Sequence, residues 1–139
     1  MKIKNLLLIG LIVPNIVWAE RFTQNGSIVY DSKTELSWQS QPSTNQFNWN
    51  SAKNHCTNLS YGGKSDWRLP NIDELKSLVD YNKYKPAMAT NFIDIKTDDY
   101  YWSSSKYAND SSQAWDVDFN GGNDRWYDKS LTYYALCVQ

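Results

Sequence analysis

Histidine is nearly absent from this sequence, which has one, His55, and cysteine occurs only twice. A tetrahedral zinc site takes several His or Cys ligands, so this composition excludes one. Nucleophilic catalysis needs a base beside the nucleophile, and the serine run at 103–105 has no evident partner. We therefore expect neither an enzyme nor a bound cofactor. His55 is expected to be a solvated or hydrogen-bonded helix residue.

A long hydrophobic run is also missing, because no apolar stretch approaches the roughly 20 residues that a membrane-spanning helix requires. The first residues instead carry two lysines, an apolar stretch over 6–17, and small residues at Val17 and Ala19. This order is typical of a secretory signal peptide over 1–19. We expect a single domain over 20–139, secreted, at the cell surface or periplasmic, that meets a membrane only through the transient signal peptide. The alternative is a retained N-terminal anchor.

The sequence has no excess of positive charge. It holds 14 basic and 15 acidic residues, and loss of the two leader lysines gives a mature net charge of about −3. Nucleic-acid-binding domains carry a basic patch or stripe, so we expect no nucleic-acid partner. The same negative balance disfavours polyanions through the global field of the protein.

Aromatic residues, by contrast, are abundant: the chain has seven tryptophans and ten tyrosines. Each large ring buries about 150–250 Å². We therefore expect a structural core of rings that contains Trp38, Trp67, Trp102 and Trp115. Trp126 follows a flexible Asn-Gly-Gly-Asn turn, beyond the regular strand pattern. We expect its ring to be exposed for a ligand, and the alternative is a structural ring that covers the sheet.

The two cysteines, Cys56 and Cys137, form an even pair. An even pair in a chain with an export signal indicates a disulfide bond. The bond would close a loop of about 80 residues and stabilise the fold by roughly 4–5 kcal/mol. Two free buried thiols are the alternative.

Apolar periodicity and turn signals predict an α+β order of strands, two helices and further strands. A β-hairpin is expected over 22–38. Asn48 can cap a helix that places Cys56 toward the core, and Asn71 with Glu74 forms a capping box for a second helix. The later elements are a loop over 82–99, strands over 100–103, 114–119, 125–127 and 133–138, and a tight turn over 120–123.

Asp116 and Asp118 form the most suggestive pair of carboxylates. The segment from Asp116 onward matches the first half of an EF-hand loop, but Tyr127 stands where a bidentate Glu is required. A weak calcium site with Asn120 or Asp124 is an alternative, although no metal is expected. Nothing in the pattern marks the opposed acid and base roles of a glycosidase. We expect a solvated strand face.

Arg68 lies between Trp67 and a Leu-Pro pair, an unusual place for a charge. We expect Trp67 and Arg68 to have structural roles. The arginine would pair with a carboxylate such as Asp66, Asp73 or Glu74, or donate to loop carbonyls.

Several segments of the chain, in this order, resemble a known family: Leu36–Trp38, the helix with Ala52 and Cys56, Gly63–Pro70 followed by Ile72–Leu75, Tyr101–Ser105, Trp115–Phe119 and the terminal Cys137-Val138. The Asp-Trp-Arg-Leu-Pro and Tyr-Trp-Ser-Ser-Ser segments are the most specific. They resemble the C-terminal domain family of the Legionella collagen-like adhesin, over about residues 22–139.

The resemblance implies a C-type lectin-like fold, a twisted antiparallel sheet with two helices. In that fold a cysteine of the first helix bonds one in the last strand, which fits Cys56 and Cys137. The resemblance also implies extracellular recognition, and the named adhesin binds sulfated polysaccharides and host surfaces. This chain is acidic, has no collagen-like stalk and lacks a calcium–sugar motif, so heparin affinity, trimer formation and calcium-dependent sugar binding are not expected to carry over.

We therefore expect an exported recognition or adhesion module that binds a surface glycan, a polysaccharide or an envelope protein. The alternative is a structural or assembly subunit of a pilus or envelope complex, which would use the same surface for a protein partner. Ligand contacts are expected on the hairpin over 116–127, with Trp126 as a flat face for a sugar ring and polar contacts from Arg125, Tyr127, Asp116, Asp118 and Asn123.

Overall fold

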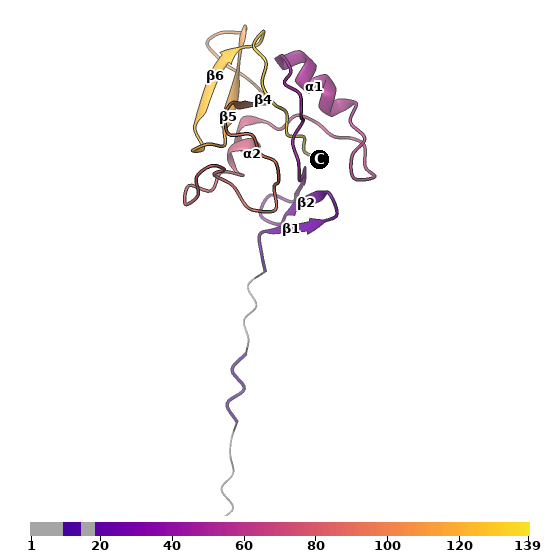
Figure 1. The fold of residues 1–139 in the computed structure, drawn as a ribbon, viewed down its shortest axis with the longest axis vertical. Helices are drawn as coiled ribbons and strands as arrows, with labels where there is room; N and C mark the ends of the chain where they lie inside the picture. Colours follow the sequence, from indigo (N-terminus) through magenta and orange to yellow (C-terminus); the bar gives the residue numbers. More distant parts are fainter. Residues whose placement is uncertain (1–9, 15–18) are drawn as a thin grey trace, which may run out of the picture.

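The computed structural model describes residues 10–14 and 19–139. The leader predicted over 1–19 therefore lies mostly outside the described residues and stays a prediction. Two three-stranded antiparallel sheets and two helices make an α+β fold, as the sequence predicts (Figure 1). The elements are β1 (Phe22–Asn25), β2 (Ile28–Asp31), β3 (Leu36–Gln39), α1 (Trp49–Thr57), α2 (Ile72–Lys76), β4 (Tyr100–Lys106), β5 (Gln113–Asp118) and β6 (Asp124–Asp128).

The N-terminal sheet has the strand order β1-β2-β3, one strand more than the predicted hairpin. A turn at Gly26, which has a φ of 61°, joins β1 to β2. The sequence pattern missed β1 because Thr23, Gln24 and Asn25 are all exposed, which leaves no apolar alternation to find.

Both helices begin at the predicted caps. The Asn48 side chain accepts a hydrogen bond from the Ser51 backbone N–H over 2.9 Å at the start of α1. At the start of α2, Asn71 and Glu74 form the reciprocal bonds of a capping box. No helix among residues 10–14 and 19–139 is both long and apolar enough to cross a membrane.

The segment over 133–138, predicted as a strand, forms isolated bridges instead. Tyr134 exchanges backbone hydrogen bonds with β4, whereas the carbonyl of Cys137 accepts from Gln39 of β3. Because neighbouring residues pair with different partners, no continuous ladder forms. The segment thereby links the two sheets.

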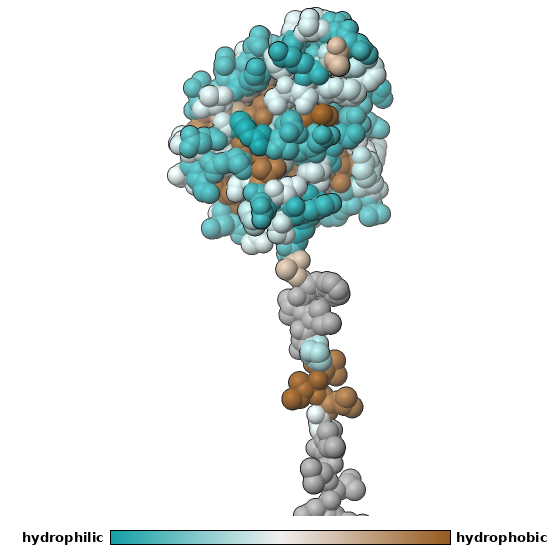
Figure 2. Space-filling model, turned by 180° about the vertical axis from the view of Figure 1, so that it is seen from behind, coloured by the Kyte–Doolittle hydropathy of each residue, from teal (hydrophilic) through white to brown (hydrophobic). Residues whose placement is uncertain are grey.

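The core consists of two clusters of buried side chains on opposite faces of the β4-β5-β6 sheet. One contains Trp38, Tyr101, Val117 and Phe119. The other contains Trp49, Trp67, Trp102, Tyr133 and the disulfide. Polar side chains cover most of the face in Figure 2, and hydrophobic atoms show between them in the middle of the body.

The predicted disulfide between Cys56 and Cys137 is confirmed, with a Cα–Cα distance of 5.5 Å and a sequence separation of 81. It joins α1 to the C-terminal segment inside the second cluster. Trp38, Trp67 and Trp102 are buried as expected. The expectation for Trp115 is wrong, since its ring is only half-buried and packs against Tyr107 and Trp126 instead.

Candidate functional site

Strand pairing divides the predicted ligand residues between two faces of the β4-β5-β6 sheet. Trp115 lies opposite Trp126, and Asp116 lies opposite Arg125, in the β5–β6 register. Successive side chains of a strand point to opposite faces. The Trp126 face of β6 is therefore separate from the Asp116 face, which also carries Arg125 and Tyr127. One sugar ring cannot lie on Trp126 and reach Asp116 directly.

The Trp126 face carries a cluster of three rings, which we call the aromatic platform: Tyr107, Trp115 and Trp126. Trp126 lies parallel to Tyr107, with ring centroids 4.6 Å apart and an interplanar angle of 6°. Trp115 meets Trp126 edge-on, with centroids 5.0 Å apart. Trp126 is 43% exposed, as the sequence suggested. It belongs to the edge strand β6, however, and does not lie beyond the sheet pattern.

The sequence pattern predicts a polar loop over 104–113, which includes Tyr107. Tyr107 follows β4 directly, beyond an irregularity in the β4–β5 register between Trp102 and Lys106. Its backbone N–H donates to the Gln113 carbonyl over 3.0 Å, which brings its ring beside β5 and β6. No local sequence signal marks this contact, because the contact depends on the pairing of β4 with β5.

Asp116 on the opposite face is completely buried, and neither of its carboxylate oxygens has a hydrogen-bond partner among the described residues. The expectation of a solvated strand face is therefore wrong for Asp116, whereas Asp118 is partly exposed. Trp102 lies opposite Asp116 on β4, and Tyr133 packs against Trp102 with ring centroids 4.7 Å apart. Burial raises the pKa of Asp116 to about 8, and the nearby Arg125 opposes this rise only in part.

Three tyrosines pack over this side of the sheet. The hydroxyls of Tyr100 and Tyr127 lie 3.4 Å apart, and Tyr133 packs against both rings. The hydrogen bond with Tyr127, together with burial, raises the pKa of Tyr100 to about 12. The three rings together enclose the Asp116 carboxyl within a largely apolar environment.

Asp118 and Asn123 lie at a small acidic hollow of about 220 Å³, together with Asn120. One oxygen of Asp118 accepts from the Gly121 backbone N–H over 2.9 Å, so this carboxylate closes the β5–β6 turn. Within residues 10–14 and 19–139, no group of three or more His, Cys, Asp or Glu side chains is arranged to hold a metal ion.

Arg68 donates two hydrogen bonds to Glu74, over 2.7 and 2.6 Å. Glu74 also accepts from the Asn71 backbone N–H at the start of α2. The hydrogen bonds from Arg68 lower the pKa of Glu74 despite its partial burial. The pair connects the segment before α2 to the first turn of that helix.

His55 stacks on Phe47, with ring centroids 4.6 Å apart, and its buried Nε2 has no hydrogen-bond partner among the described residues. Burial lowers the pKa of His55. The half-buried ring thus packs on Phe47 and keeps part of its surface toward solvent, but its Nε2 makes no hydrogen bond of the kind expected among the described residues.

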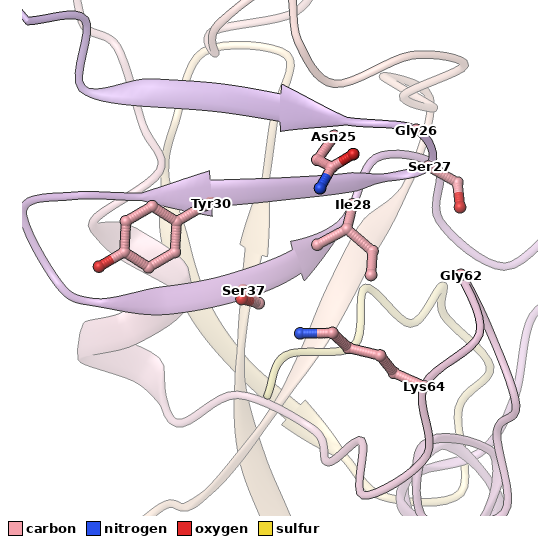
Figure 3. Close-up of a pocket in the computed structure, with 8 residues that line it drawn as sticks. All are labelled: Asn25, Gly26, Ser27, Ile28, Tyr30, Ser37, Gly62 and Lys64. Atoms are coloured by element: carbon pink, nitrogen blue, oxygen red, sulfur yellow. The ribbon is translucent and has the colours of Figure 1, made fainter.

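A larger hollow, which we call the outer-sheet hollow, lies on the exposed face of the N-terminal sheet. Its volume is about 540 Å³, and Figure 3 shows it between the β1–β2 turn, β3 and the loop that follows α1. Sequence reasoning missed this site, because it combines segments that are far apart in the chain. It is lined by Asn25, Gly26, Ser27, Ile28, Tyr30, Ser37, Gly62 and Lys64.

Two comparisons with known proteins bear on this arrangement. A search of curated proteins found no match to the chain. The family model of the Lcl C-terminal domain matches residues 27–139, which include every strand and helix after β1. This match agrees with the family that the sequence motifs resemble. The chain therefore belongs to the Lcl C-terminal domain family.

Proposed function

We propose that this protein is an exported recognition module that binds a surface glycan or related surface polymer through the aromatic platform. Membership of an adhesin-associated family supports a recognition role. The disulfide supports export to an oxidising compartment, at the cell surface, in the periplasm or outside the cell. The disulfide link between α1 and the C-terminal segment also supports the C-type lectin-like fold.

The observation that carries the proposal is the exposed indole of Trp126. Tyr107 covers one side of this ring at 4.6 Å and Trp115 touches its edge, so the ring is held in place by its neighbours. A hollow of about 200 Å³ runs along Asp124–Tyr127. A rigid aromatic ring presents a flat apolar area at a low cost in conformational entropy. Such an area suits the apolar face of a sugar ring.

The polar groups near Trp126 differ from those that the sequence predicts. Asp124 shares its face of β6 and is 3.2 Å from the Lys76 ammonium of α2. Asp124 also lines the hollow along Asp124–Tyr127, so this pair supplies the polar groups for a sugar stacked on Trp126. Arg125 and Tyr127 extend toward the other face. They can contact only a ligand that wraps around the edge of β6.

An assembly role is a second candidate, and the open edge of β6 favours it. The Asp118 N–H donates to the Asn123 carbonyl over 2.9 Å at the turn. Hydrogen-bonded and non-bonded pairs alternate in an antiparallel ladder, so the peptide groups of Asp124 and Trp126 point away from β5. An extended segment of an envelope protein can pair with such an edge.

A glycan array probed with the purified chain, followed by the variant Trp126→Ala, tests the proposal. We expect at least a tenfold loss of affinity for any glycan bound. Loss of the ring contacts should cost about 1–2 kcal/mol of stability. The matched control is Tyr84→Ala, which removes a ring that is 68% exposed and lines a different hollow. A Trp126→Ala protein that still binds in its folded fraction overturns the proposal. Co-purification of one envelope protein without any glycan signal favours the assembly role.

A further inference from the structure

The outer-sheet hollow has walls from three separate segments. Asn25, Ile28, Tyr30 and Ser37 share the solvent-facing side of the sheet, as the register of β1, β2 and β3 requires. Lys64 comes from the loop that follows α1. In Figure 3 its side chain extends across the hollow, with the ammonium below Ser37 and Ile28. The hollow therefore combines an apolar floor, an aromatic wall, and amide, hydroxyl and ammonium donors.

The loop that carries Lys64 is held against the sheet. Tyr61 and Lys64 exchange two backbone hydrogen bonds of 3.0 Å each. The Trp67 indole N–H donates to the Lys64 carbonyl over 3.1 Å. Gly62 has a φ of 60°, and a Cβ there would lie 2.7 Å from Ile28, so only glycine allows this close approach. The backbone of Lys64 is thus positioned before any ligand arrives.

The charge in this hollow is opposite to that of the chain as a whole. No carboxylate lines it. Within residues 19–139, the ion pairs join Arg21 to Asp31, Arg68 to Glu74 and Lys76 to Asp124, and none uses Lys64. A single ammonium in an otherwise neutral cup can neutralise one negative charge, while the 15 acidic residues of the chain oppose a dense polyanion.

We propose that the outer-sheet hollow binds a sugar residue that carries one carboxylate, at a site separate from the aromatic platform. Lys64 pairs with the carboxylate, while Asn25, Ser27 and Ser37 exchange hydrogen bonds with ring hydroxyls. The ring of Tyr30, 42% exposed, lies against the sugar. This inference does not depend on the platform, because none of the rings around Trp126 lines the hollow.

Titration of the purified full chain by NMR with glucuronic acid, glucose and glucose 6-sulfate tests this inference. Glucuronic acid should shift the amide signals of Tyr30 and Lys64. Glucose, which lacks the carboxylate, should bind about tenfold more weakly, the value of one charge-assisted hydrogen bond. Lys64→Gln should weaken the binding of glucuronic acid by a similar factor and leave the binding of glucose unchanged. The matched control is Lys33→Gln, an exposed lysine in the β2–β3 turn.

Equal affinity for glucose and glucuronic acid overturns the assignment, as does unchanged binding by a folded Lys64→Gln protein. Glucose 6-sulfate binding as tightly as glucuronic acid overturns the preference for a carboxylate. Amide shifts confined to residues outside the hollow overturn the proposed location of the site. The variant Trp126→Ala separates this inference from the proposed function, because it should lose platform binding and keep the affinity for glucuronic acid.

Discussion

Replacing Asp116 by Asn should remove a large part of the pH dependence of stability. The side chain is completely buried and unpartnered among the described residues, and burial raises its pKa from about 3.8 to about 8. The native state therefore keeps this proton up to about pH 8, whereas the unfolded chain releases it near pH 4. Stability from this group is greatest below pH 4 and falls as pH rises through that window.

The size of the effect follows from the same pKa shift. Each pH unit within the window changes the free energy of unfolding by about 1.4 kcal/mol. Between pH 5 and pH 8 the wild-type chain should lose roughly 3–4 kcal/mol through Asp116, with the last unit contributing less as the native carboxyl ionises. Arg125, directly opposite on β6, attracts the carboxylate, and the pKa of about 8 is the value that results with this attraction present.

Urea unfolding followed by tryptophan fluorescence at pH 5, 6, 7 and 8 measures the effect. The Asp116→Asn protein should show a flatter profile than wild type by the amount given above. Asp66→Asn is the matched control, because Asp66 is exposed and its φ of 66° suits asparagine equally well. Parallel profiles for wild type and Asp116→Asn would refute the reasoning and show that the carboxyl is solvated or paired in solution.

Four further outcomes are expected from denaturation. Gly122→Ala should cost about 2–4 kcal/mol, because its φ is 85° and a Cβ would lie 2.2 Å from Val79; an unchanged melt contradicts the turn geometry. Arg21→Met should cost about 3 kcal/mol, since it removes the partner of the buried Asp31 carboxylate. Burial opposes ionisation of Asp31, but its hydrogen bonds outweigh this effect and lower its pKa. The stability difference between Arg21→Met and wild type should therefore shrink as pH falls below about 4. A difference that does not change with pH contradicts the pairing. Removing the disulfide by reduction should cost about 4–5 kcal/mol. Calcium should not shift the melt in either redox state; a large shift contradicts the expectation that no metal stabilises the fold.

Local signals in the sequence were sufficient for several parts of the fold. The caps at Asn48 and Asn71 were predicted because a capping side chain bonds to a backbone N–H two or three residues away. The pairing of Cys56 with Cys137 followed from their number and the export signal. The turn over 120–123 followed from its Asn-Gly-Gly-Asn composition.

Features that depend on distant contacts were missed or misjudged. The exposed strand β1 has no apolar pattern, and the C-terminal segment divides its hydrogen bonds between two sheets. Asp116 resembled a solvated residue because its neighbours Val117 and Phe119 point to the other face. The face of β5 that carries Asp116 is also buried, because Trp102 and Tyr133 pack there. The sequence around residue 116 gives no signal of this packing.

The sequence by itself was enough to identify the α+β order, the helix starts, the cysteine pair and the family, because each depends on residue types at short or countable spacings. The export signal rests on the same kind of pattern and stays a prediction. The tertiary structure alone decided which rings form the aromatic platform, which face of β5 holds Asp116, and that Lys64 lies over the N-terminal sheet. These results depend on strand register and loop placement. A shift of one residue in register exchanges the two faces of a strand, so side-chain environments there follow only once the sheets are assembled.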